Sequence, residues 1–200
     1  MNSQAWDERY RSSTLVWGAR PNCWVEQELA DVPPGRALDL ACGEGRNALW
    51  LAARGWQVSA LDFSPVALDK ARTLQSAQPA GKGAVSWVCT DATTYRHGEP
   101  LELVLLCYLH LVADERRAAV ANAAGALAPG GTLLVIGHDS SNIAHGVGGP
   151  QDPSVLFTAA DIVDDLAGTD LVIERAETVR RRVEAAERPA LDALLRAHRP

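Results

Sequence analysis

The sequence lacks any long apolar run, and this absence limits what the chain can be. Although 47% of its 200 residues are hydrophobic, no stretch reaches the ~18 apolar residues that a membrane helix needs. The opening segment, MNSQAWDERYR, also lacks the apolar core of a secretory signal peptide. We therefore expect a cytoplasmic protein that has no membrane partner.

Paired cysteines are absent as well. The zinc and dithiol motifs place two cysteines within a CxxC unit, and this chain has none. We expect no metal site. Three of the thiols sit in apolar runs, and buried free thiols are typical of a reducing compartment. The four cysteines are Cys23, Cys42, Cys89 and Cys107.

The chain has no excess of positive charge. Its 19 Lys and Arg stand against 25 Asp and Glu, which gives a net charge of −6. Binding to a phosphate backbone relies on basic residues, so we expect no nucleic-acid partner. The most basic run, Arg180–Arg182, is followed by acidic residues, and we interpret it as a solvated turn or strand edge without a functional role.

What is present is an alternation of short β-type runs with helical runs, which is typical of a parallel sheet covered by helices. The length suits one domain, 1–200, in which residues 1–34 form an appended flap because they are too few to bury a core. On period alone, 191–198 could be helix or strand. The predicted strands are 37–41, 57–61, 84–89, 101–107, 132–137 and 170–178.

Capping residues mark the predicted helices. Ser64, followed by proline, begins one helix, and Thr158 begins a short helix that ends at Gly168. Asp114 is predicted to cap another helix, and Pro129–Gly131 is predicted to end it.

The segment ALDLACGEGRNALWLA carries the first functional signal. A buried strand containing Asp39 enters a helix through Gly43 and Gly45. In open parallel sheets, ligands bind beyond the carboxyl ends of the strands. Glycines allow close backbone approach, and the helix contributes its positive end. The segment therefore predicts a nucleotide-type site.

Two further acids follow the next two strands. Asp62 is placed to accept hydrogen bonds from ribose hydroxyls, and Asp91 to meet an adenine amino group. Either could instead cap a turn, but with Asp39 they predict an adenosine site. Ala48 replaces the third glycine of a dinucleotide motif, which disfavours NAD. An NAD-type module stays as the alternative.

The motifs DLACGEGRN, LDFS and TDA resemble the first three motifs of class I S-adenosylmethionine-dependent methyltransferases. WDERY, WGARPN, CYLHL and APGGTLLVIG are similar to the small-molecule branch that includes the tellurite-resistance methyltransferases. The resemblance implies an α/β fold, a Rossmann-like three-layer sandwich with a seven-stranded, mostly parallel sheet whose last strand, 191–198, is antiparallel. One departure is Ala41, where many members have glycine; its methyl group must point away from the ligand.

The resemblance also implies a function, the transfer of a methyl group from S-adenosylmethionine to a small molecule. A fold that binds the cofactor without turnover is a further alternative. Asp39 and the two glycines would border the methionine part, Asp62 the ribose, and Asp91 with Ala92 the adenine. The expected cofactor-binding residues are Arg9, Tyr10, Trp17, Asp39, Ala41, Gly43, Gly45, Arg46, Asn47, Asp62, Phe63, Asp91, Ala92 and Cys107.

The acceptor side is predicted from three histidines in loops that follow strands, His110, His138 and His145. Each could take a proton from an acceptor or be a structural hydrogen-bonding residue. His145 is the first candidate, because its Gly-rich segment is too long for a simple connection. The acceptor remains open between a thiol, a hydroxyl, an amine and a chalcogen oxyanion. A monomer is expected rather than a homodimer.

Overall fold

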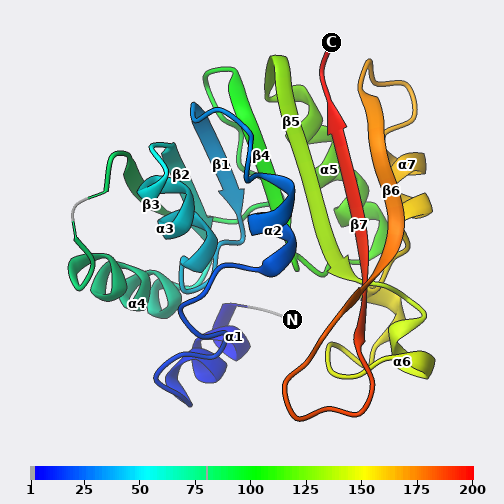
Figure 1. Ribbon diagram of the computed structural model, residues 1–200, viewed down its shortest axis with the longest axis horizontal. Coiled ribbons are helices and arrows are strands. Elements are labelled where there is room, and N and C mark those ends of the chain that lie inside the picture. The colour runs from blue at the N-terminus through cyan, green and yellow to red at the C-terminus, as the bar shows by residue number, and fades with distance from the viewer. Residues whose placement is uncertain (1–2, 80) are drawn as a thin grey trace. The chain divides into compact units, whose positions relative to one another are not determined.

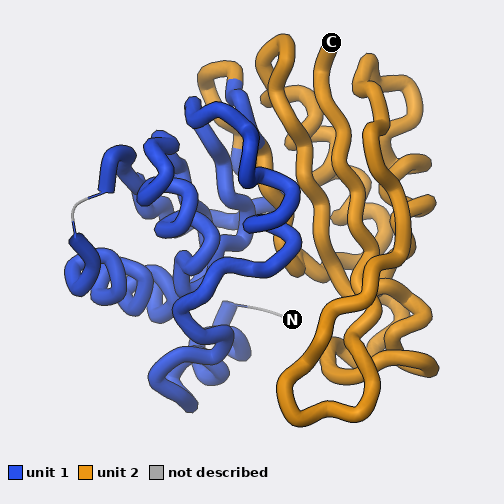
Figure 2. Tube along the Cα trace, viewed as in Figure 1, with its two compact units in different colours: residues 1–95, 101–103 blue, residues 96–100, 104–200 orange. Residues whose placement is uncertain are grey.

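The computed structural model describes residues 3–79 and 81–200, so the first two residues of the predicted flap lie outside the described residues. The chain divides into two compact units (Figure 2). Unit 1 runs as far as Tyr95 and includes Leu101–Leu103, and unit 2 comprises Arg96–Pro100 and Val104–Pro200. That all 200 residues act as one domain stays a prediction.

The strands form one sheet in the order β3-β2-β1-β4-β5-β7-β6 (Figure 1). β1 pairs in parallel with β2, and β2 with β3, whereas β7 is antiparallel to both β5 and β6. The predicted seven-stranded sheet with an antiparallel last strand is confirmed. Its strands are β1 (Arg36–Leu40), β2 (Gln57–Asp62), β3 (Ala84–Cys89), β4 (Leu101–Cys107), β5 (Leu127–His138), β6 (Val172–Arg181) and β7 (Ala190–His198).

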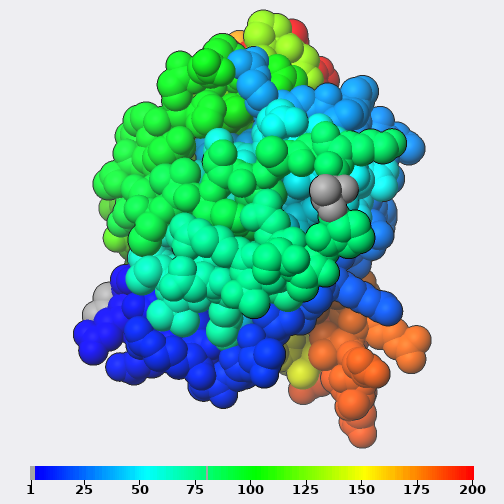
Figure 3. Space-filling model, turned by 90° about the vertical axis from the view of Figure 1, so that its left-hand side faces the viewer, coloured from blue at the N-terminus to red at the C-terminus, as the bar shows by residue number. Residues whose placement is uncertain are grey.

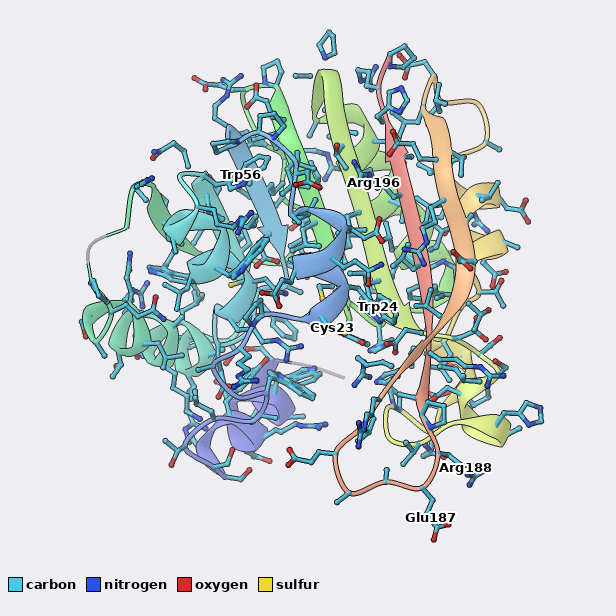
Figure 4. The ribbon with its side chains drawn as sticks, in the orientation of Figure 1. Cys23, Trp24, Trp56, Glu187, Arg188 and Arg196 are labelled. Carbon is cyan, nitrogen blue, oxygen red and sulfur yellow. The ribbon has the colours of Figure 1, made fainter. Side chains whose placement is uncertain are left out.

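Burial follows the position of each strand in this order. β1 and β4 are almost wholly buried, and in β5 all residues from Thr132 to Gly137 are buried, as expected for strands covered on both faces. The edge strand β6 is largely exposed. Its Glu174 forms an ion pair with Arg196, labelled in Figure 4, and lies 3.0 Å from His198 Nδ1. Charged side chains on an edge strand discourage edge-to-edge pairing.

Unit 1 contains α1 (Ser3–Arg11), α2 (Cys23–Glu28), α3 (Arg46–Ala53) and α4 (Pro65–Ser76). The prediction that Ser64 caps a helix is confirmed, since its hydroxyl accepts from Ala67 N at 3.1 Å. In the predicted flap, α1 packs against α4; Figure 3 shows the blue residues of the flap beside α4. Trp56, labelled in Figure 4, is buried just before β2.

Unit 2 contains α5 (Ala113–Gly125), α6 (Asn142–His145), a 3-10 turn (Pro153–Val155) and α7 (Ala159–Asp165). Thr158 forms a capping box with Asp161, which confirms its predicted role. The helix ends at Asp165, before the predicted stop at Gly168. A buried ion pair between Arg116 and Asp165, with 2.6 Å between Nε and Oδ2, joins α5 to α7.

Two predictions about α5 are wrong. The N-cap is Val112, and Asp114 lies in the first turn, where it pairs with Arg117 on the surface. The helix ends at Gly125, and the Pro-Gly-Gly segment belongs to β5. Backbone hydrogen bonds with Arg199 explain this: Gly130 N donates to Arg199 O, and Arg199 N donates to Gly131 O. Tertiary pairing therefore overrides the local turn signal.

The prediction that the thiols in apolar runs are buried holds only in part, because Cys42 is buried whereas Cys89, on the edge strand β3, is exposed.

Within residues 3–79 and 81–200, no helix combines the length and the apolar character that crossing a bilayer requires.

Gly137 provides a test of packing in unit 2. A Cβ at this position would lie only 2.7 Å from Cε1 of the buried Phe157 ring. We expect Gly137→Ala to cost about 1–3 kcal/mol of stability through overpacking, which lowers Tm by about 2–4 °C per kcal/mol. Gly125→Ala is the control, because its Cβ would meet nothing within 4 Å. Thermal melts that show equal Tm values for the two variants would contradict this packing.

Candidate functional site

The turn between β1 and α3 has an unusual backbone. Ala41, Gly43 and Gly45 have φ values of 60°, 55° and 80°, in the left-handed region that favours glycine. A side chain at Gly45 would collide with the Trp87 ring, and a Cβ at Gly43 would lie 2.9 Å from the Tyr10 hydroxyl. Both glycines are thus required by the protein's own packing. Ala41 adopts the same conformation with a Cβ present.

Asp39 is the most exceptional residue of this turn region. Its side chain is buried, with 1% of its surface exposed, and neither oxygen has a hydrogen-bond partner of normal geometry among the described residues. Burial, with the neighbouring Asp62 charge, raises the pKa of Asp39 to about 7, although Arg46 and the Ala48 backbone N–H favour the charged form. A buried carboxylate without a hydrogen-bond partner would be stabilised by a cationic ligand.

Asp62, by contrast, is satisfied by the backbone. Gly43 N donates to its Oδ2 at 2.8 Å, and Ser64 N donates to its Oδ1 at 2.9 Å. Burial raises its pKa, and these two hydrogen bonds act in the opposite direction. Each carboxylate oxygen has two lone pairs, so both can still accept a hydroxyl group. The carboxylate therefore shapes the glycine turn and keeps capacity for a ligand.

Glu44 was not predicted as a functional residue, yet it fastens the flap to the turn. Its buried carboxylate accepts from Val16 N at 2.9 Å and from Trp17 N at 3.2 Å. Lys70 Nζ lies 3.1 Å from Glu44 Oε1 and also donates to the backbone oxygens of Tyr10 and Ser13. In the sequence, Glu44 looks like an ordinary polar turn residue between two glycines, so no local signal marks it.

Further hydrogen bonds join the flap to the segments that follow β1 and β2, including the first turn of α3. Ser64 Oγ bonds to Asp7, and Ser3 Oγ donates to Phe63 O at 3.1 Å. Asn22 N donates to Asn47 Oδ1 at 2.9 Å. Within unit 1, the flap is thus attached around the predicted cofactor residues. Phe63 and Asn47 contribute to that attachment through these bonds.

The aromatic residues of the flap form a cluster beside the turn. Trp6 stacks on Tyr10 and lies 6.3 Å from the Trp17 ring, and the Arg9 guanidinium lies over both indoles at 5.2 and 5.0 Å. Arg46 Nη1 donates to Trp17 O. Burial raises the pKa of Tyr10, so its hydroxyl stays protonated.

Asp91 and Ala92 follow β3. Asp91 is exposed, and its Oδ1 accepts from both the backbone N–H and the hydroxyl of Thr93. This is the turn-capping role that the sequence left open. Ala92 is buried. Their contact with adenine stays a prediction.

In unit 2, two of the three candidate histidines lie together. His110 and His138 stack with ring centroids 5.5 Å apart, and the His138 backbone N–H donates to His110 Nε2 at 3.1 Å. Burial, with His138 nearby, lowers the pKa of His110 to about 4, so this ring is neutral. Its proton therefore sits on Nδ1. Since Nε2 is already an acceptor, His110 is poorly placed to act as a base.

His145 has a different setting. It is exposed at the end of the short helix α6, where its backbone N–H donates to Ser141 O. Its catalytic role stays a prediction.

Cys107, the last residue of β4, is half-buried, and its cofactor contact also stays a prediction.

Residues 37–131 match the model of a family described as a methyltransferase domain. This range includes the glycine turn, Asp62 and Asp91. The match covers just under half of the chain. The resemblance to the class I S-adenosylmethionine-dependent methyltransferases is thereby confirmed.

Two curated proteins are similar in sequence to part of this chain. Nodulation protein S of Rhizobium tropici is 34% identical over 109 residues, which are 53% of this chain and 44% of that protein. The tRNA 5-carboxymethoxyuridine methyltransferase of Escherichia coli K12 is 31% identical over 127 residues, 62% of this chain and 47% of that protein. The chain thus matches less than half the length of each of these relatives.

Solved structures share the fold. The N-methyltransferase NodS from Bradyrhizobium japonicum, in complex with S-adenosyl-L-homocysteine, aligns with a TM-score of 0.74 and 19% identity over 100% of both chains. TehB from Haemophilus influenzae aligns with a TM-score of 0.72 and 16% identity over 92% of this chain and 64% of that one. These likenesses confirm the Rossmann-like fold of the methyltransferase domain.

Glu44→Gln should loosen the flap from this domain. The change removes the charge that accepts the Val16 and Trp17 N–H groups and pairs with Lys70, and hydrogen bonds to a charged group contribute about 1.5–3 kcal/mol. We expect trypsin to cleave after the exposed Arg11, which is followed by Ser12, about tenfold faster or more. Glu8→Gln, an exposed change on α1, is the control. Equal cleavage rates for the two variants would show that Glu44 does not hold the flap.

Asp39→Asn should alter how stability depends on pH. Because the folded-state pKa of Asp39 is raised to about 7 from an ordinary 3.8, the folded state loses stability as the pH rises through this interval. Asparagine carries no charge to bury. The difference in Tm between the variant and the wild type should therefore grow in the variant's favour from pH 5 to pH 8, by about 2–4 °C for each kcal/mol of stability that the wild type loses. Asp31→Asn, on an exposed acid, should show no such trend. A constant Tm difference for Asp39→Asn would refute the raised pKa.

Proposed function

We propose that this protein binds S-adenosylmethionine and transfers its methyl group to a small molecule. The observation that carries the proposal is the buried Asp39 carboxylate, which lacks a partner of normal geometry beside a left-handed glycine turn. A ligand with a cationic group would supply the missing partner. S-adenosylmethionine carries an ammonium and a sulfonium, whereas the pyrophosphate of NAD would be repelled by this acid.

The described residues fit such a ligand. Asp39 and the glycine turn would border its methionine part, and Asp62, with lone pairs to spare, its ribose hydroxyls. Asp91 and Ala92 would border the adenine. The flap aromatics lie against the turn, where their faces suit a sulfonium charge.

When bound, the cofactor supplies an activated methyl group. The protein's part is then to align the acceptor and exclude water, and positioning can supply about 7–11 kcal/mol of such a barrier. The flap is suited to water exclusion, because Glu44 and Lys70 fix it to the turn. Opening of the flap would admit the cofactor.

The acceptor is proposed to be a small molecule: a thiol, a hydroxyl, an amine or a chalcogen oxyanion. One relative is named as a tRNA methyltransferase, but the net charge of −6 opposes binding to a phosphate backbone. We further propose that the protein works as a cytoplasmic monomer.

Calorimetric titration with S-adenosylmethionine, S-adenosylhomocysteine and NAD tests the cofactor. We expect binding of the first two and none of NAD. Asp39→Asn should weaken S-adenosylmethionine binding about tenfold or more, because a charged contact worth about 1.5–3 kcal/mol is lost, while Asp31→Asn should bind normally. NAD binding would overturn the proposal. If the protein binds the cofactor but releases no S-adenosylhomocysteine with any acceptor, it would be a methyltransferase fold without catalytic activity.

A further inference from the structure

We propose that S-adenosylmethionine binding is coupled to the release of a proton, because Asp39 is a neutral acid in the free protein and ionises when a cation pairs with it. This inference rests on the proposed function and goes beyond it, since it makes the affinity for the cofactor depend on pH. The residues concerned all belong to unit 1, in which β1 and β2 lie side by side (Figure 1).

The first support is the lack of a group that could accommodate a charge on Asp39. Only 1% of this residue's surface is exposed, and within residues 3–79 and 81–200 neither carboxyl oxygen has a hydrogen-bond partner of normal geometry. Ionisation of such a group is costly, because burial removes its hydration and no donor replaces it. A protonated carboxyl group carries no charge and costs much less to bury.

The second support is the neighbouring carboxylate of Asp62, which is better able to carry a charge. It accepts from Gly43 N at 2.8 Å and from Ser64 N at 2.9 Å, and these donors oppose the rise in pKa that burial causes. Where two buried carboxyl groups lie close together, the one with fewer donors keeps its proton. Asp62 therefore holds the negative charge of the pair, and this charge opposes the ionisation of Asp39.

The other titratable groups around Asp39 do not reverse this assignment. Cys42 lies in the turn after β1, and burial raises the pKa of its thiol. Tyr10, on α1, faces Asp62, and burial raises the pKa of its hydroxyl. Both groups therefore stay protonated. Arg46, the first residue of α3, favours the ionised form of Asp39, yet burial still raises the pKa of Asp39 to about 7.

Unit 1 contains no histidine, the side chain that ordinarily titrates near neutral pH. All five histidines of the chain belong to unit 2. Glu102, which lies beside the start of β1, is paired with Arg36, and this pairing lowers the pKa of the Glu102 carboxyl. A proton that leaves unit 1 near pH 7 is therefore assigned to Asp39.

One O–H bond breaks in the proposed step. In the free protein below pH 7, Asp39 is a carboxyl group and Asp62 a carboxylate. When an ammonium group lies against it, Asp39 releases its proton to the buffer and keeps the electron pair on its oxygen. An ion pair then takes the place of a neutral buried acid.

The direction of the pH dependence follows from this step. Because Asp39 must lose its proton before it can pair with a cation, affinity falls as the pH falls through about 7. About a tenth of the free protein carries this proton at pH 8 and about nine tenths at pH 6. The Kd for S-adenosylmethionine should therefore be about tenfold higher at pH 6 than at pH 8.

The experiment counts the protons by calorimetric titration with S-adenosylmethionine, in buffers of the same pH but different ionisation enthalpy. We expect release of about 0.9 proton per cofactor at pH 6, about 0.5 at pH 7 and about 0.1 at pH 8. Asp39→Asn has no proton to lose, so its count should be near zero throughout and its Kd should lack the tenfold change. Asp31→Asn, the same change at an exposed acid, should behave as the wild type.

Arg46→Gln provides a check of direction. Removal of this cation takes away a charge that favours ionised Asp39, so the midpoint of the pH dependence should move to higher pH. A shift to lower pH would contradict the assignment.

Infrared spectroscopy tests the same proton without relying on calorimetry, because a protonated carboxyl group and a carboxylate absorb at different frequencies. The free wild-type protein should show a protonated-carboxyl band that titrates near pH 7 and is missing from Asp39→Asn. At pH 6, addition of S-adenosylmethionine should remove this band. These spectra of the free protein stay informative even if Asp39→Asn no longer binds the cofactor.

Three results would each overturn the coupling: cofactor binding at pH 6 without proton release, an equal proton count in Asp39→Asn, or the absence of the titrating band from the free wild type. Failure of the wild-type protein to bind S-adenosylmethionine at any pH from 6 to 8 would instead refute the proposed function. The two failures are therefore distinguishable.

Discussion

Unit 1 depends on the burial of two carboxylates at neighbouring strands. Asp39 and Asp62 lie at or near the carboxyl ends of β1 and β2, and burial raises the pKa of both. Asp62 is compensated by two backbone N–H groups, one of them from the left-handed Gly43. The turn thus takes its shape from one acid and leaves the other without a partner of normal geometry. Glu44, the third acid of the region, then binds the flap over that turn.

Much of the fold could be predicted because many of its signals are local. A capping residue acts on its own first turn, so Ser64 and Thr158 were recognisable from their neighbours alone. Acids at the carboxyl ends of buried parallel strands come to one edge of the sheet by topology, which made the positions of Asp39 and Asp62 recognisable. The predicted N-cap Asp114 was wrong, because the helix begins one residue earlier, at Ala113, with Val112 as its N-cap. The predicted helix stop at the Pro-Gly-Gly segment was wrong because backbone pairing with Arg199 makes this segment part of β5.

Other contacts could not be predicted, because they join residues that are far apart in sequence. Arg181 belongs to the basic run that was interpreted as solvated, yet its guanidinium is bound to Asp192. The signal that could have found it is the register of β6 and β7, in which Val179 pairs with Asp192, so that Arg181, two residues on, shares a face with that pair. His145 was favoured for the length of its segment, a feature that carries no information about what its ring contacts.

The unpaired Asp39 also links the lifetime of the protein to its ligand. A ligand that binds only the folded state adds stability in proportion to the logarithm of its concentration above its Kd. The pairing of a cation with Asp39 contributes to that affinity, because it relieves a buried charge that the empty fold must otherwise accommodate. Under the proposed function, cells that exhaust their methyl donor would hold a less stable population of this protein, more open to proteolysis, and its abundance would follow the donor supply without any dedicated regulator.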